Sequence, residues 1–214
     1  MNKLAKRPTI LVSSTVYGIE ELLERIYATL TTFGYEVWMS HKGTLPVHSG
    51  STAFDNCLKA VDQCDLFLGI ITPSYGSGMD DSGLSIVHQE INRAIELNKL
   101  RWLLTHDQVV FARRLLRDLG HNTPEKRKKL KLKPGANSIT DLRVIDMYED
   151  AIRHEEPRMT ERYGNWVQKF NSDPDALLFA SAQFSRFQEV ERFIQENMAN
   201  PEQVKTKQRK GGEQ

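Results

Sequence analysis

The sequence predicts an open α/β fold in which helices cover both faces of a parallel sheet. Short apolar runs alternate with amphipathic helical stretches through the first half of the chain, and the connections between them are short. Strands that are covered on both faces are apolar throughout, and strand–helix alternation builds parallel sheets with right-handed crossovers. We therefore expect a flavodoxin-like sheet of order 2-1-3-4-5 that also carries a helical insertion.

Five segments have the pattern of strands. The third is the most apolar run of the chain, which is typical of a central strand, whereas the second and fifth alternate apolar with polar residues, as edge strands do. The expected strands are residues 9–12, 35–39, 66–71, 101–104 and 166–170.

Six further segments repeat apolar residues at helical spacing. The expected helices are residues 17–32, 51–63, 84–98, 108–119, 142–152 and 173–198. We expect one domain over residues 1–200, with the helical insertion at about 106–164. Residues 201–214 have almost no apolar side chains, which predicts a disordered tail.

Composition excludes several classes of protein. Lysine and arginine (29) nearly balance aspartate and glutamate (28), and this excludes a globally basic nucleic-acid binder. Two cysteines cannot form a disulfide framework, and no apolar run approaches the roughly 20 residues of a membrane helix. The fingerprints of dinucleotide-binding loops, P-loops, serine hydrolases and zinc proteases are absent from the sequence. We expect a soluble cytoplasmic protein without a metal.

Ligands of such folds bind at the carboxyl ends of the strands. Ser13, Ser14 and Thr15 follow the first strand and place three hydroxyl groups before a helix, where phosphate oxygens are favoured. The alternative is that they only cap that helix. Tyr75 and Gly76 follow the third strand, where the aromatic ring could stack on a base, although turn chemistry accounts equally well for the glycine.

Glu90 is the most informative residue. On a helical wheel it falls inside the apolar arc of its helix, where an uncompensated carboxylate costs several kcal/mol. It is therefore either a functional carboxylate with a raised pKa, or one half of a structural ion pair with Arg93 or the basic region. His88 lies opposite the apolar arc, and we expect it to be solvated.

The insertion contains a charged run, PEKRKKLKLK at residues 124–133, whose basic residues lie between positions 126 and 133. Such a run usually forms a solvated surface, which we expect here for all its cationic side chains, Arg127 included. Contact with a nucleic acid, a nucleotide or an acidic partner is the alternative, but no aromatic residue interleaves the run.

Three stretches resemble a bacterial family of uncharacterised domains, domain of unknown function 4062. They are ILVSSTVYGIEELLERI, CDLFLGIITPSYGSG and SIVHQEINRAIE, and NWVQKF with the helix after it resembles the closing segment of that family. The family is similar to a divergent branch of the Toll/interleukin-1 receptor (TIR) fold. The resemblance covers residues 8–105 well and 165–198 loosely, whereas residues 106–164 have no counterpart in a minimal TIR domain.

The resemblance implies an enzyme that cleaves the nicotinamide–ribose bond of NAD, here a substrate rather than a cofactor. Glu90 matches the glutamate that TIR enzymes need, although the tryptophan that many of them carry before it is missing. Ser13–Thr15 and Tyr17 would then line the phosphate and ribose side, with Tyr75 and Gly76 against the base or nicotinamide. Antiviral defence or stress signalling is the implied role.

Two other functions remain open. The chain is alternatively a catalytically silent TIR-like interaction module, or an enzyme similar to nucleoside deoxyribosyltransferases, which also use a glutamate beside a ribose. We expect a homodimer or larger assembly through the helices at 108–119 and 142–152 or through residues 179–194, because apolar residues crowd these segments. A separate sensor or effector chain is a further expected partner, whereas membranes and nucleic acids are not.

Overall fold

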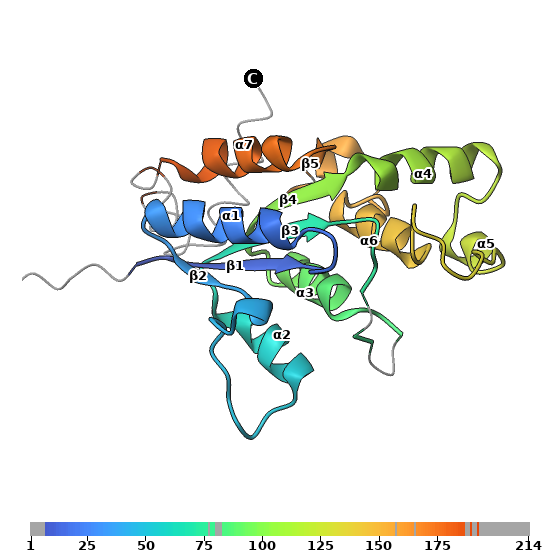
Figure 1. The fold of residues 1–214 in the computed structure, drawn as a ribbon. Helices are drawn as coiled ribbons and strands as arrows, with labels where there is room; N and C mark the ends of the chain where they lie inside the picture. The colour runs from blue at the N-terminus through green and yellow to red at the C-terminus, as the bar shows by residue number, and fades with distance from the viewer. Residues whose placement is uncertain are drawn as a thin grey trace, which may run out of the picture.

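A five-stranded parallel sheet of order β2-β1-β3-β4-β5 forms the centre of the protein (Figure 1). The computed structural model describes residues 7–76, 78–79, 83–156, 158–164, 166–186, 189 and 192. The strands are β1 (Thr9–Ser14), β2 (Glu36–Trp38), β3 (Leu66–Ile71), β4 (Leu100–His106) and β5 (Val167–Phe170). The predicted fold class and strand order are therefore confirmed.

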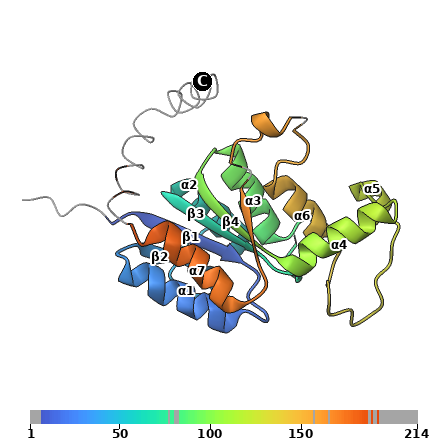
Figure 2. The same cartoon turned by 90° about the horizontal axis from the view of Figure 1, so that it is seen from above.

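Helices cover both faces of this sheet. One face carries α1 (Glu20–Thr32) and α7 (Asp173–Phe184), which lie side by side (Figure 2). The other face carries α2 (Ala53–Gln63), α3 (Ile86–Glu96) and α6 (Arg143–Ala151). Each layer closes over its own apolar core, so β3 is buried along its whole length.

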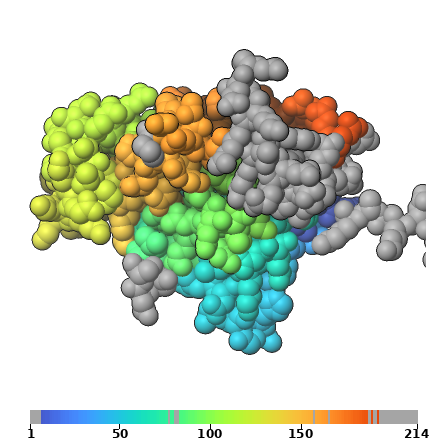
Figure 3. Space-filling view, turned by 180° about the vertical axis from the view of Figure 1, so that it is seen from behind, coloured from blue at the N-terminus to red at the C-terminus, as the bar shows by residue number. Residues whose placement is uncertain are grey.

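The segment between β4 and β5 supplies a group of helices beyond the carboxyl ends of the strands. This group contains α4 (Asp107–Asp118), α5 (Pro124–Arg127) and α6. The short 3₁₀ helix η2 (Met159–Glu161) follows them, and the chain after it passes Arg101 near the start of β4 before it enters β5. Here α6 packs on α3, and α4 packs on α6. Seen from behind, α4 and the residues after it form a lobe at one side of the molecule (Figure 3).

The boundaries of some elements differ from those predicted. β1 extends to Ser14, because that residue still pairs with Ile70 of β3. α1 begins at Glu20 rather than at residue 17, after a turn in which Gly18 has a φ of +85°. α7 ends at Phe184, and most of the predicted helix beyond it, like residues 201–214, lies outside the described residues.

Within the described part of the chain, no helix combines the length and the apolar character that crossing a membrane requires.

Candidate functional site

Glu90 lies in the second turn of α3, against the strand that ends beside it. The helix begins at Ile86 because the side chain of Ser85 caps it by accepting a hydrogen bond from the backbone N–H of His88. Glu90 is only 5% exposed, and its Oε2 accepts a hydrogen bond of 2.5 Å from the hydroxyl of Ser13 on β1. The thiol of Cys57, on α2, is its second hydrogen-bonding neighbour. Three elements therefore converge on one carboxyl group.

Burial governs the charge of this carboxyl group. It raises the pKa of Glu90 to about 7, although the hydrogen bonds from Ser13 and Cys57 act in the opposite direction. Among the described residues, no lysine, arginine or histidine forms an ion pair with Glu90; Arg93 instead pairs with Asp62 and Glu96, at 2.8 Å each. The predicted alternative of an ion pair with Arg93 is therefore wrong, because that side chain points away along the helix surface.

Burial also affects the neighbouring thiol. It raises the pKa of Cys57 to about 12, and the adjacent carboxylate of Glu90 adds to the effect. Cys57 therefore stays a neutral thiol that can donate a hydrogen bond to Glu90. Both hydrogen-bonding neighbours of the carboxyl group are uncharged, so its negative charge has no counter-charge in the cluster.

The three hydroxyl residues at the carboxyl end of β1 connect this strand to the end of β3. Ser13 bonds Glu90, and the hydroxyl of Ser14 donates to the backbone oxygen of Ile70 at 3.0 Å. The hydroxyl of Thr15 lies 2.6 Å from that of Thr72 and also donates to the backbone oxygen of Ser74. The alternative that these residues merely cap α1 is wrong: α1 begins at Glu20, and its N-cap Ile19 makes no side-chain capping bond.

Gly76 brings the loop after β3 against the end of β1. Its φ is +89°, a conformation that favours glycine, and a Cβ built on it would lie 2.9 Å from the side chain of Thr15. Tyr17, by contrast, is 78% exposed in the turn after β1. The structure thus places Ser13, Thr15, Gly76 and Glu90 at the carboxyl ends of β1 and β3, with Tyr17 on the nearby surface.

Tyr75 is buried, and its contacts point away from this edge. Its hydroxyl lies 2.8 Å from Nδ1 of His88, and the guanidinium of Arg143 covers its ring at 4.8 Å from the centroid. The ring would have to leave this position before it could stack on a base. Its neighbour His88 continues the chain of contacts, with Nε2 2.7 Å from Oδ2 of Asp150 on α6.

His88 is therefore not solvated, and that expectation was wrong. The side of α3 opposite its apolar arc is covered by α6, which lies about 60 positions further along the chain and which a helical wheel does not contain. Burial of a polar ring requires hydrogen-bonding partners, and Tyr75 and Asp150 provide them.

The basic run is also not uniformly solvated. Arg127 is 3% exposed, and its Nη2 forms ion pairs with Asp146 at 2.5 Å and with Glu149 at 2.6 Å. The lysines of the run are exposed, as predicted. Arg127 differs from them because it faces α6, whose two carboxylates offset the cost of burying its charge.

The cluster has the chemistry of a proton-transfer or cation-stabilising group rather than of a metal centre. A carboxyl group with a pKa near 7 can hold or release a proton at neutral pH, and its ionised form stabilises positive charge that develops nearby. The described residues contain no group of three His, Cys, Asp or Glu side chains placed to hold a metal ion. The sequence did not predict Cys57, Thr72 and Asp150 as partners of the site residues. Of the three, only Cys57 could have been found from the sequence, because it lies in the apolar stripe of its helix.

The fold and this cluster define an open α/β domain with a buried carboxyl group at the carboxyl edge of its parallel sheet. The chain belongs to the family described as "Domain of unknown function (DUF4062)", whose family model matches residues 9–199. No curated protein sequence matches the chain. Among solved structures, a conserved protein from Enterococcus faecalis V583 is similar, with 12% identity and a TM-score of 0.42 over 83% of this chain and 99% of that one.

Proposed function

We propose that this protein resembles TIR-type enzymes in its activity and cleaves the bond between nicotinamide and ribose in NAD. One observation carries the proposal: the carboxyl group of Glu90 is buried at the ligand-binding edge of the sheet with neutral hydrogen-bonding neighbours and no cation. A carboxylate that only stabilised the fold would be expected to pair with a cation, because burying an uncompensated charge is costly. Glu90 is instead available to a positively charged reaction centre.

The proposed reaction breaks the N-glycosidic bond through a transition state that resembles an oxocarbenium ion. The electron pair of the bond leaves with the ring nitrogen, which converts the pyridinium into neutral nicotinamide. The carboxylate of Glu90 stabilises the positive charge that develops on the ribose. Water then adds to the ribose carbon and loses one proton, which gives ADP-ribose; attack by a group of the same molecule would give a cyclised product.

Neighbouring residues have defined tasks in this proposal. The hydroxyl of Ser13 holds the orientation of Glu90, and the exposed Tyr17 is available to the ribose or phosphate side. The hydroxyls of Ser14 and Thr15 would have to exchange their present hydrogen bonds before they could contact that side of the substrate. Because Glu90 is only 5% exposed, the carboxyl edge must open before a ribose can reach it. Antiviral defence or stress signalling, with a separate sensor or effector chain, is the role that we propose for this activity.

The test is product analysis after incubation of the purified protein with NAD. The wild type should release nicotinamide and ADP-ribose, and Glu90→Gln should lower the rate by about 100-fold or more because it keeps the shape but deletes the charge. Glu96→Gln is the matched control, since Glu96 is exposed on the same helix. Equal rates for wild type and Glu90→Gln would contradict the assignment. Release of a free base from deoxynucleosides but not from NAD would favour the deoxyribosyltransferase-like activity.

A second candidate function is assembly with another copy of the chain, and it rests on α4. Phe111 and Leu115 of this helix and Leu119, which directly follows it, recur every four residues and are 66%, 46% and 63% exposed. A continuous apolar stripe of this kind usually marks an interface. Light scattering should then give a mass above the 24.6 kDa of one chain, and Phe111→Ser with Leu119→Ser should lower it. A monomer at high protein concentration, with and without NAD, would contradict this candidate.

A further inference from the structure

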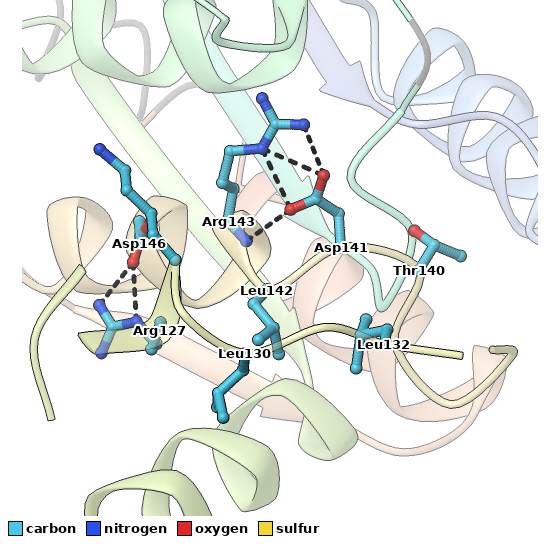
Figure 4. A pocket seen from close by; sticks show the side chains of 9 residues that line it. Arg127, Leu130, Leu132, Thr140, Asp141, Leu142, Arg143 and Asp146 are labelled. Carbon is cyan, nitrogen blue, oxygen red and sulfur yellow. Dashed lines mark hydrogen bonds and ion pairs between the residues drawn. The ribbon is translucent and has the colours of Figure 1, made fainter. Parts of the chain in front are cut away.

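The segment between β4 and β5 contains a surface pocket of about 280 Å³ that is separate from the Glu90 cluster (Figure 4). All of its lining residues come from this one segment. They are Arg127, Lys128, Leu130, Leu132, Thr140, Asp141, Leu142, Arg143 and Asp146. Three leucines supply apolar surface, and the rest of the lining is polar or charged. The pocket is slightly smaller than the usual small-molecule sites of roughly 300–1,000 Å³, so it fits a small ligand.

Both carboxylates of the lining are already occupied. Asp141 accepts hydrogen bonds from Nε and Nη2 of Arg143, and Oδ1 of Asp146 accepts from Nε and Nη2 of Arg127. Figure 4 shows these two ion pairs on either side of Leu142, with Leu130 close by. The pair Arg143–Asp141 is neutral, and Arg127 with Asp146 belongs to a network in which Glu149 and Arg113 complete the balance of two positive and two negative charges. Both ion pairs therefore offer little to a cationic ligand.

Lys128 is the exception in this lining. It is exposed, and no ion pair or side-chain hydrogen bond joins its ammonium group to another described residue. The pocket therefore combines an apolar surface, two internally neutralised ion pairs and one uncommitted positive charge. A ligand that matches all three has an apolar body and a single negative charge.

We infer that this pocket binds a small organic acid, with the carboxylate at Lys128 and the apolar body against Leu130, Leu132 and Leu142. A carboxylate and an ammonium group form a charge-assisted hydrogen bond, which is about twice as strong as a neutral one. The inference does not depend on NAD cleavage, because the pocket residues are different from those of the Glu90 cluster.

The position of the pocket connects it to the loop after β3. The hydroxyl of Thr140 accepts a hydrogen bond of 3.1 Å from the backbone N–H of Tyr75. Arg143 donates to the backbone oxygen of Gly83 and covers the ring of Tyr75. A ligand in the pocket therefore contacts two residues that hold the loop bordering the candidate site.

The test uses hexanoate and its neutral analogue hexanamide as probes, with binding followed by NMR of the leucine methyl groups. For a ligand of about eight non-hydrogen atoms we expect a Kd on the order of millimolar. Hexanoate should bind about tenfold more tightly than hexanamide to the wild type, and its affinity should fall as salt is added. Lys128→Gln should remove this preference, whereas Lys131→Gln, in an exposed lysine outside the pocket, should keep it.

Three results would overturn the inference: no shift of the signals of Leu130 and Leu132 with hexanoate, equal affinity for both probes in the wild type, or an unchanged preference in Lys128→Gln. Leu132→Asn provides a second variant, since Leu132 is at the rim and 40% exposed. This variant should lower the affinity for hexanoate and for hexanamide by the same factor, because it removes apolar contact but no charge. Folding of each variant is checked by circular dichroism before titration.

Discussion

Glu90 and Arg127 are both buried, and they are held in opposite ways. Glu90 is 5% exposed and hydrogen-bonds to an alcohol and a thiol, whereas Arg127 is 3% exposed and forms ion pairs with two carboxylates. The similar degree of burial therefore has different consequences. Arg127 keeps its charge because its partners compensate it, whereas Glu90 changes its protonation near neutral pH because nothing does.

This difference separates structural charges from functional ones. A compensated buried charge fixes one arrangement of the chain, and its removal leaves the partner charges without a counter-ion. An uncompensated buried carboxyl group makes the fold less stable whenever it is ionised, and such groups gather at functional sites. The exposed fractions of Arg127 and Glu90 are similar, so only their hydrogen-bonding and ion-pair partners distinguish the structural charge from the functional one.

The largest expected effect is that of Arg127→Met on stability. The variant leaves the half-buried carboxylate of Asp146 without its counter-charge and takes one of the two arginines from Glu149, which stays paired with Arg113. The free energy of unfolding should therefore fall by about 3–5 kcal/mol. Urea denaturation measures this loss. Lys129→Met, at an exposed position of the same run, is the control and should stay within about 0.5 kcal/mol. A loss below about 1 kcal/mol in Arg127→Met would remove the contrast with Glu90.

Glu90 should make the protein less stable as the pH rises. Its pKa is about 7 in the folded state against an ordinary value of 4.5, so between these values the folded state binds more protons than the unfolded state. The free energy of unfolding therefore falls as the pH rises from 4.5 to 7 and Glu90 loses its proton. The loss is roughly 3 kcal/mol, because each unit of difference in pKa corresponds to about 1.4 kcal/mol.

Glu90→Gln cannot ionise and should escape this loss. Its stability relative to the wild type should therefore rise by roughly 3 kcal/mol between pH 4 and pH 8, measured by denaturation of both proteins across that range. Glu96→Gln, on the exposed side of α3, should show no comparable trend. A difference between Glu90→Gln and wild type that does not change with pH would show that Glu90 is not held as an uncompensated carboxyl group.

Removal of a buried hydroxyl group should have an intermediate effect. Tyr75→Phe removes the hydroxyl that contacts Nδ1 of His88 and accepts from the backbone N–H of Ser85, so both are left buried without this partner. We expect a loss of about 2 kcal/mol in the free energy of unfolding. Tyr17→Phe, at an exposed hydroxyl, should change it by less than about 0.5 kcal/mol. If both variants have the same stability, the Tyr75–His88 contact contributes nothing measurable.

The smallest effect is expected in the exposed part of the basic run. Neutralising Lys128, Lys129 and Lys131 together should change the free energy of unfolding by no more than about 0.5 kcal/mol, because these side chains are solvated. Binding of DNA or RNA should also be weak in both wild type and variant, as measured by fluorescence anisotropy. Tight, steeply salt-dependent binding that the triple variant loses would overturn this expectation.

The sequence by itself determined the sheet, its strand order and the unusual position of Glu90. The strands and the position of Glu90 follow from local periodicity: apolar runs give buried parallel strands, and a helical wheel places Glu90 among apolar side chains. The strand order follows from the flavodoxin-like fold class that the alternation of strands and helices predicts. The same reasoning predicted that β2 and β5 lie at the edges. Each of these results depends on residues that are neighbours in the chain.

Only the tertiary structure decided which polar residues have partners. Glu90 meets Ser13 and Cys57 from two other elements, and His88 and Arg127 are both buried against α6. These contacts join residues 19 to 77 positions apart, so no periodicity within one helix can reveal them. Whether a buried charge is compensated depends on the groups within a few ångströms of it, and packing alone brings those groups together.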